Sequence, residues 1–368
     1  MKIAIIGLPK SGKTTIFNAL TRGRAKVGTY SPSLAPNIGV TKVSDARLPL
    51  LENIFQPKKT VPAEISYVDI AFSSQTTFSQ GEIKGEFLNY LTTADALLQV
   101  VRAFADEKLP HPQGSIDHKR DIATMDLELA FSDLAIIQKR LDKLEVSLKG
   151  AKAQERGAYL KEQVLLQKLK SALENEIPIR QQNLSGDELK ALSNYQFLTA
   201  KPMLIILNIK EEQISQAPQL EEEIRSTYPP LNLIQGNVIA LCGKLEMELS
   251  QLEEAEAAEF RQAMGLTAPA LDQVIDLSYR SLGLISFFTT ASAELKAWTI
   301  PQGTTAPKAA GKVHSDMERG FIRAEVISYS DLERCGNLVE ARRTGLLRIE
   351  GKNYIIQDGD IVTFLFNV

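Results

Sequence analysis

Four short apolar runs recur in the first two-thirds of the chain, and stretches with helical periodicity separate them. The runs are rich in Val and Ile and cover residues 2–6, 63–68, 96–101 and 202–208. Runs that are apolar at consecutive positions are typical of parallel strands buried on both faces. The pattern therefore predicts an α/β fold whose centre is a doubly wound, mostly parallel sheet.

Between the third and fourth runs, apolar residues instead alternate spacings of three and four. This seam consists of Leu127, Ala130, Leu134, Ile137, Leu141, Leu144 and Leu148. Apolar positions resume after a turn near residues 149–157 and continue to Leu173. Such a seam predicts two antiparallel helices that form a hairpin inserted into the sheet domain. Two ordinary surface helices packed on the sheet are the alternative, but the narrow seam and its charged flanks favour a projecting hairpin.

The last quarter of the chain changes to a β-rich pattern. A helical stretch is predicted over residues 249–264, and short strands with Gly-containing turns follow from Leu284. We expect strands at 285–289, 296–300, 323–327, 346–349, 353–356 and 361–364. The predicted organisation has three parts: a discontinuous sheet domain (1–121 and 196–280), the antiparallel helical hairpin (122–195) and a small α+β domain (281–368).

Composition narrows the class of protein. The 368 residues are 44% hydrophobic and 24% charged, as in soluble globular proteins. The formal net charge of -3 provides no global attraction to DNA or an anionic membrane, so any basic contact surface must be local. No run approaches the ~20 apolar residues of a membrane span, and the first apolar run is shorter than expected of a signal peptide. With two Cys and three dispersed His, a Cys/His metal site is not expected. These features predict a cytoplasmic protein.

The strongest chemical signal lies directly after the first predicted strand. Residues Gly7 to Thr14 read Gly-Leu-Pro-Lys-Ser-Gly-Lys-Thr, which fits the phosphate-binding loop G-x-x-x-x-G-K-[ST] between a strand and a helix. In such loops the backbone N–H groups surround a phosphate and the helix N-terminus adds positive potential. We expect Lys13 to reach the β and γ oxygens of a nucleoside triphosphate and Thr14 to bind Mg²⁺.

Two later strand ends carry matching residues. Asp69 ends the second predicted strand, where a carboxylate can orient Mg²⁺. The fourth is followed by Asn208-Ile209-Lys210-Glu211, where nucleotide-binding proteins that read guanine carry N-K-x-D. Because Glu211 replaces the Asp that normally holds guanine, adenine becomes a plausible base.

Together these motifs resemble the YchF subfamily of Obg-related P-loop NTPases. The likeness also rests on Asn37-Ile38-Gly39-Val40, on Val68-Asp69-Ile70-Ala71 and on the helical insertion. The segments 319–327 and 357–360 are similar to the TGS domain of that subfamily. The resemblance runs essentially from end to end. It implies an NTPase that prefers ATP to GTP, binds the ribosome or ribosomal RNA, and acts in translation or stress responses. We also expect a requirement for Mg²⁺ and a monomeric state.

The resemblance also assigns site residues by position. Lys10, Ser11, Gly12, Lys13, Thr14 and Thr15 would form the triphosphate cradle that begins at Gly7. Ser33 takes the place of a switch Thr that contacts Mg²⁺ beside Thr14 and Asp69. Ile209 would face the base, with Asn208 and Glu211 in support. Cys242 and Gly243 take the place of the later base-contact loop.

Three positions depart from that subfamily's pattern. Phe72 replaces the Gly that lets a backbone N–H approach the γ-phosphate, and Ser73 replaces a hydrophobic residue. Pro32 stands in place of a Cys linked to redox control in some members.

The expected function is slow, Mg²⁺-dependent hydrolysis of ATP, or of GTP, in which Lys13 is the catalytic residue. The alternative is a degenerate nucleotide-binding ribosome or RNA adaptor without significant hydrolysis.

Overall fold

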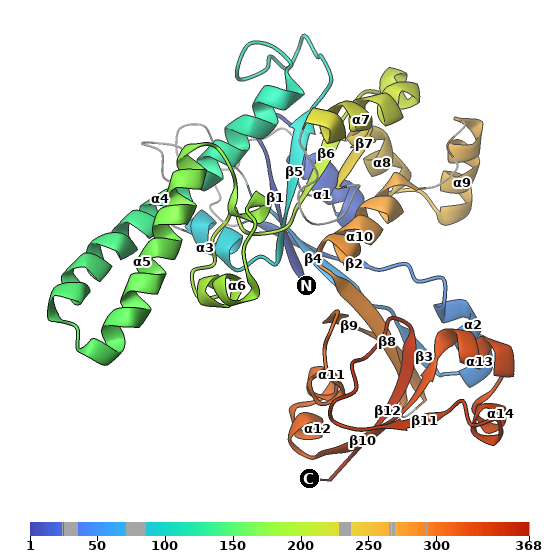
Figure 1. Cartoon of the computed structure of the whole chain (residues 1–368). Helices are drawn as coiled ribbons and strands as arrows, with labels where there is room; N and C mark the ends of the chain where they lie inside the picture. Colours follow the sequence, from blue (N-terminus) through green and yellow to red (C-terminus); the bar gives the residue numbers. More distant parts are fainter. Residues whose placement is uncertain are drawn as a thin grey trace. The chain divides into compact units, whose positions relative to one another are not determined.

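The computed structural model describes residues 1–23, 25, 36–70, 86–227, 237–264, 266, 269–291 and 293–367. The chain divides into two compact units (Figure 1). One comprises Lys2–Gly39 and Ser66–Leu271; the other comprises Met1, Val40–Ile65 and Asp272–Val368. Within the described residues, no helix is both long enough and apolar enough to cross a bilayer.

The first unit is built on a six-stranded sheet in the order β2-β4-β1-β5-β6-β7. Strand β1 pairs in parallel with β4 and β5, and β6 pairs in parallel with β5 and β7. The doubly wound, mostly parallel sheet expected from the apolar runs is confirmed. The strands are β1 (Lys2–Ile6), β2 (Asn37–Lys42), β4 (Glu64–Asp69), β5 (Ala96–Arg102), β6 (Met203–Asn208) and β7 (Val238–Leu241).

Helices cover this sheet and bury two separate apolar clusters, as a doubly wound fold requires. In one cluster Ile6 and Leu97 pack with Leu129; in the other Leu207 packs with Ile224 and Leu245. The helices of this unit, apart from the hairpin, are α1 (Lys13–Thr21), α3 (Glu86–Thr92), η1 (Ile179–Gln181), α6 (Gly186–Leu192), η2 (Glu211–Gln216), α7 (Ala217–Thr227), α8 (Gly243–Leu249) and α9 (Glu254–Ala263).

The helical stretch expected over residues 249–264 is confirmed in part, since α9 covers Glu254–Ala263. Helix α8 ends at Leu249 and α9 begins at Glu254, after Glu253 has adopted an extended backbone conformation. Leu249 is buried in the cluster beside β6 and β7, and Leu252 packs on the same cluster. Both leucines contact this cluster on either side of the break between the two helices.

The predicted hairpin is present as α4 (His118–Gly150) and α5 (Ala153–Glu174). Its seam is closed by apolar residues of both helices, among them Ile137, Leu144, Leu166 and Leu169. Figure 1 shows the two helices side by side, with their connection far from the sheet. The turn is tighter than expected. Since α5 already begins at Ala153, Arg156 and Gly157 lie inside that helix.

A buried carboxylate joins α4 to the chain that leads into β6. Asp133 is fully buried and accepts hydrogen bonds from the backbone N–H of Leu198 (2.8 Å) and Thr199 (2.8 Å) and from the Thr199 hydroxyl (2.6 Å). Burial is the largest influence on this group, and it raises the pKa of Asp133 to about 6 despite these three donors.

The raised pKa predicts a pH-dependent stability. A carboxyl that binds its proton more tightly when folded loses its contribution as pH rises through the shifted range. We therefore expect Asp133 to lower the free energy of unfolding by about 2 kcal/mol between pH 4 and pH 6. The measurement is urea unfolding of wild type and Asp133→Asn at several pH values. The variant should have the flatter profile in this window; parallel profiles would contradict the prediction.

The second unit contains a mixed six-stranded sheet in the order β11-β10-β12-β8-β9-β3. Most neighbours are antiparallel, but β12 pairs with β8 and β3 pairs with β9 in parallel. The strands are β3 (Lys59–Val61), β8 (Leu284–Ala291), β9 (Glu294–Pro301), β10 (Phe321–Ser328), β11 (Arg348–Glu350) and β12 (Asp360–Phe366). The helices are α2 (Leu48–Phe55), α10 (Ala270–Ser281), α11 (Ala306–Val313), α12 (Ser315–Arg319), α13 (Tyr329–Cys335) and α14 (Leu338–Arg343).

Two features of this unit differ from the expectation. Residues 353–356 form no strand; they contribute one isolated bridge, from Ile355 to Thr305. Residues 40–65, expected in the sheet domain, group with the C-terminal residues because β3 pairs with β9 and Arg47 forms an ion pair with Asp358 (2.8 Å). The three-part domain division remains a proposal, since compactness by itself separates only two units.

Candidate nucleotide-binding site

The loop between β1 and α1 has a backbone that only glycine can adopt at two positions. Gly7 has φ 145° and Gly12 has φ 97°. A Cβ at Gly7 would lie 2.3 Å from the carbonyl oxygen of Val100, and one at Gly12 would lie 2.2 Å from Nδ2 of Asn208. The loop is therefore pressed against the ends of β5 and β6, and side chains at these positions are excluded.

Lys13 is the first residue of α1, and its side chain extends back into this loop. Its side chain is buried, and its Nζ donates to the carbonyl oxygens of Gly7 (2.9 Å) and Leu8 (3.0 Å). Burial lowers the pKa of Lys13 to about 8, while the negative charge of Asp69 acts in the opposite direction. A cation held among backbone dipoles at the start of a helix is a phosphate-binding arrangement.

Thr14 and Asp69 meet at the N-terminus of α1. The Thr14 hydroxyl donates to Oδ2 of Asp69 (2.8 Å), and Nδ2 of Asn37 donates to the same oxygen (3.2 Å). Asp69 is buried, and its Oδ1 has no hydrogen-bond partner in the described part of the chain. An orphaned carboxylate oxygen beside a hydroxyl forms a donor set of hard oxygens that fits a divalent cation such as Mg²⁺. Sequence reasoning had given Asn37 no role here.

Asn208 connects the loop to the segment after β7. Its Nδ2 donates to the carbonyl oxygen of Ser11 (2.9 Å), and its Oδ1 accepts from the N–H of Gly243 (3.0 Å). Gly243 allows this close approach, because a Cβ there would lie 3.0 Å from Oδ1 of Asn208 and 2.7 Å from Cδ1 of Ile16. Asn208 thus holds two loops in register, whereas the sequence had suggested only support of the base.

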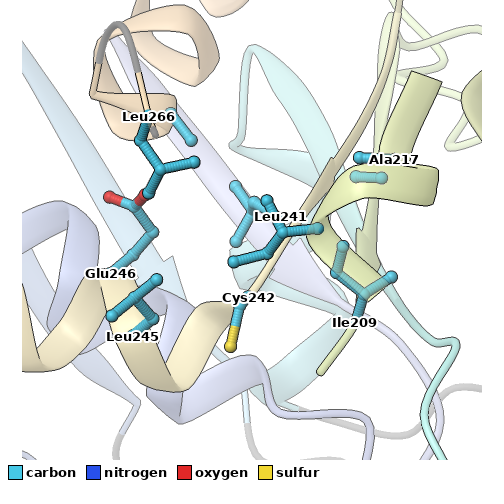
Figure 2. Close-up of a pocket in the computed structure, with 10 residues that line it drawn as sticks. Ile209, Ala217, Leu241, Cys242, Leu245, Glu246 and Leu266 are labelled. Atoms are coloured by element: carbon cyan, nitrogen blue, oxygen red, sulfur yellow. The ribbon is translucent and has the colours of Figure 1, made fainter. Parts of the chain in front are cut away.

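Ile209 is 2% exposed and packs in an apolar cluster with Cys242 and Leu245. Figure 2 shows these side chains around a cavity of about 50 Å³. This volume is far below the ~300 Å³ or more of most ligand sites. Burial raises the pKa of the Cys242 thiol. Glu211, at the start of η2, is exposed, whereas Ile209 and Cys242 are buried.

The remaining predicted residues lie as follows. Lys10 is exposed with φ 65°, and its Nζ is 3.4 Å from the carbonyl oxygen of Pro110. Ser11 is buried, and Thr15 is half-buried in the first turn of α1. Ser33, and the departures at Pro32, Phe72 and Ser73, lie outside the described residues.

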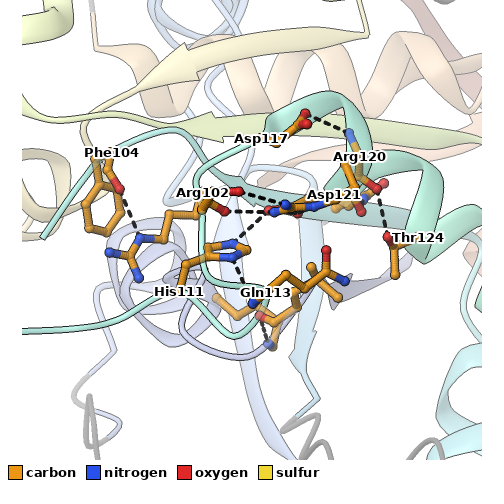
Figure 3. Close-up of polar contacts among 12 residues, drawn as sticks. Arg102, Phe104, His111, Gln113, Asp117, Arg120, Asp121 and Thr124 are labelled. Carbon is orange, nitrogen blue, oxygen red and sulfur yellow. Dashed lines mark hydrogen bonds and ion pairs between the residues drawn. The ribbon is translucent and has the colours of Figure 1, made fainter.

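Sequence reasoning missed a polar network that Figure 3 shows. Its member Asp121 lines a small pocket together with Leu8 and Ser11 of the loop between β1 and α1. Nε2 of His111 lies 2.9 Å from Oδ2 of Asp121, and both side chains are buried. Nδ1 of His111 accepts from the N–H of Gln113 (3.2 Å), and Arg120 donates to Oδ1 of Asp121 (2.8 Å). The segment after β5 is thereby fixed to the start of α4. The spacing of these residues along the sequence does not predict the network, because His111 and Asp121 are brought together only by the tertiary fold.

Within the described residues, no group of three or more His, Cys, Asp or Glu side chains could form a metal centre by itself. The geometry instead combines a glycine-dependent cradle, a buried lysine and an oxygen pair at one helix N-terminus. The residues present therefore fit a polyphosphate together with a hard divalent cation.

Two family models match this chain. The family model MMR_HSR1, described as "50S ribosome-binding GTPase", matches residues 2–137. The model YchF-GTPase_C, described as "Protein of unknown function (DUF933)", matches residues 284–367.

Full-length relatives are similar throughout. The "Ribosome-binding ATPase YchF" of Bacillus subtilis is 38% identical over 366 residues, covering 99% of this chain and 98% of the relative. The "Obg-like ATPase 1" of Caenorhabditis elegans is 34% identical, covering 100% and 92%. The solved structure of the Schizosaccharomyces pombe YchF GTPase matches with a TM-score of 0.84 at 29% identity, covering 99% of this chain and 97% of that one.

Proposed function

The chain belongs to the YchF family of P-loop NTPases, and on this premise we propose that it is an ATP-preferring, Mg²⁺-dependent NTP hydrolase that associates with the ribosome. The observation that carries the proposal is the convergence of Lys13, Thr14 and Asp69 at the N-terminus of α1. Ribosome association is inferred from relatives named "Ribosome-binding ATPase YchF", and it implies a cytoplasmic location. We propose a monomer that binds neither DNA nor membranes.

Each residue of the site has a defined task in this proposal. The ammonium of Lys13 turns from the carbonyl oxygens of Gly7 and Leu8 toward the β and γ oxygens, where it offsets the negative charge that develops on the leaving group. Thr14 and Asp69 would hold Mg²⁺, with Ser33 as a further ligand. The metal supplies neutralisation of phosphate charge when bound. Asn208 keeps the loop in register during these contacts.

Turnover measurements test this proposal. Hydrolysis of ATP and GTP should be measured with and without ribosomes, and with Mg²⁺ or EDTA. We expect slow, Mg²⁺-dependent turnover with ATP. Nucleotide binding without turnover in any of these conditions would favour the second candidate, a nucleotide-binding ribosome or RNA adaptor. The observation in favour of that candidate is the sequence Phe72-Ser73, which removes the glycine expected beside the γ-phosphate.

Base preference gives an independent prediction. Because Glu211 replaces the Asp that accepts two hydrogen bonds from guanine, we expect ATP to bind at least as tightly as GTP. Loss of one such hydrogen bond corresponds to about 1.4 kcal/mol, or roughly tenfold in affinity. Calorimetry with both nucleotides measures the difference, and Glu211→Asp should shift it toward GTP. Tenfold tighter binding of GTP by wild type would contradict the prediction.

A further inference from the structure

The distal half of the helical hairpin is strongly cationic in an otherwise acidic chain. Residues 139–161 contain seven Lys or Arg and three Asp or Glu, a net charge of +4. Since the whole chain has a net charge of -3, the remaining residues carry a net charge of -7. Such an asymmetry gives a local polyanion-binding potential that the overall charge conceals.

Most of these cations have no ion-pair partner. Within the hairpin, Arg140 pairs with Glu162 (2.8 Å) and Lys149 lies 3.6 Å from Glu145. The others take part in none of the ion pairs found in the described residues, and all are exposed. These five residues, here called the distal cations, are Lys139, Lys143, Lys152, Arg156 and Lys161.

Four of the distal cations lie on the helices, Lys139 and Lys143 on α4 and Arg156 and Lys161 on α5. Lys152 lies in the connection between the two helices. On α4, Lys139, Lys143 and Val146 follow each other at spacings of four and three, on the side opposite Ile137 and Leu144 of the seam. On α5, residues 156, 160 and 164 repeat at spacings of four, away from Leu166 and Leu169.

Exposed apolar side chains accompany the charges on each face. Val146 of α4 is 71% exposed and Val164 of α5 is 65% exposed. Helix α4 has 33 residues and is therefore about 50 Å long, and Figure 1 shows its distal end with α5 extending away from the sheet. The hairpin thus presents a narrow rod with cations and apolar groups on both sides.

We propose that the distal half of the hairpin is the ribosome-contacting element and enters a crevice lined by RNA phosphates. A flat anionic membrane or a one-sided acidic protein surface would use cations on one face, whereas phosphates on opposing RNA strands would engage both. The valines would then pack on sugar or base surfaces. This inference rests on the proposed ribosome association and identifies the surface responsible for it.

Charge-neutralising variants of the full chain provide the test. The first variant changes the five distal cations to Gln, which keeps helix propensity. The matched control changes five other exposed lysines to Gln: Lys58, Lys190, Lys308, Lys312 and Lys352. Binding to purified ribosomes, to protein-free ribosomal RNA and to anionic vesicles is measured over a series of KCl concentrations, alongside ATP affinity.

We expect the distal variant to bind ribosomes at least roughly tenfold more weakly, with a salt dependence reduced by about three to four in log–log slope. ATP affinity and the control variant should match wild type. Ribosome binding unchanged in the distal variant, or weakened equally in the control, would overturn the inference while the proposed function stands. Stronger hairpin-dependent binding to vesicles than to RNA would overturn it as well.

Two partial variants test entry into a crevice. Lys139→Gln with Lys143→Gln removes the α4 face, and Arg156→Gln with Lys161→Gln removes the α5 face; both should weaken binding. An effect confined to one pair would contradict contact on two sides. If wild type binds no ribosomes, the proposed function fails. Binding to protein-free ribosomal RNA then tests the inference separately. If that binding does not depend on the distal cations, the inference is overturned.

Discussion

Replacing Lys13 with Met should weaken ATP binding by at least roughly a hundredfold, or about 2.7 kcal/mol, and abolish any hydrolysis. The buried Nζ of Lys13 now contacts the carbonyl oxygens of Gly7 and Leu8, and it is the cation best placed to meet the β and γ oxygens. Met fills the space of the lysine stem without its charge. Calorimetric titration with ATP measures the loss.

Folding of the Lys13 variant is expected to be intact. Burial lowers the pKa of Lys13 to about 8, which shows that the charged form is costly in the absence of phosphate. The free energy of unfolding without nucleotide should therefore equal or exceed that of wild type. Lys190→Met, at an exposed site of α6, is the control and should bind ATP normally. A folded Lys13→Met variant with unchanged ATP affinity would show that the loop binds no phosphate.

Asn208→Ala is expected to have the second largest effect, because it reduces both stability and nucleotide affinity. Removing the amide leaves the carbonyl oxygen of Ser11 and the N–H of Gly243 without their buried partner. Two such groups cost about 2–4 kcal/mol in the free energy of unfolding. The loop and the segment after β7 would also lose their fixed spacing, so ATP should bind at least roughly tenfold more weakly.

Urea unfolding and calorimetry measure the two effects of Asn208→Ala separately. Asn89→Ala, at an exposed position of α3, is the matched control and should change neither quantity by a measurable amount. Loss of stability with normal ATP affinity would mean that Asn208 is purely structural. Normal stability would contradict the bridging geometry itself.

Local spacing was enough to identify the phosphate loop and its two principal side chains. Gly7, Gly12, Lys13 and Thr14 lie within eight consecutive residues, and their positions follow from one strand, one turn and one helix start. Asp69 could be placed with them because parallel strands bring their carboxyl ends to one edge of the sheet. The apolar runs and the three-four seam likewise predicted the sheet and the hairpin.

Contacts between distant segments were decided only by the tertiary structure. Asn208 bridges Ser11 and Gly243, and His111 pairs with Asp121, through positions that no periodicity relates. Residues 40–65 join the C-terminal sheet because β3 finds its hydrogen-bonding partner in β9, more than two hundred residues later. The physical reason is general: local sequence fixes backbone conformation and the buried face of each element, whereas the pairing of buried polar groups depends on which elements the completed fold brings together.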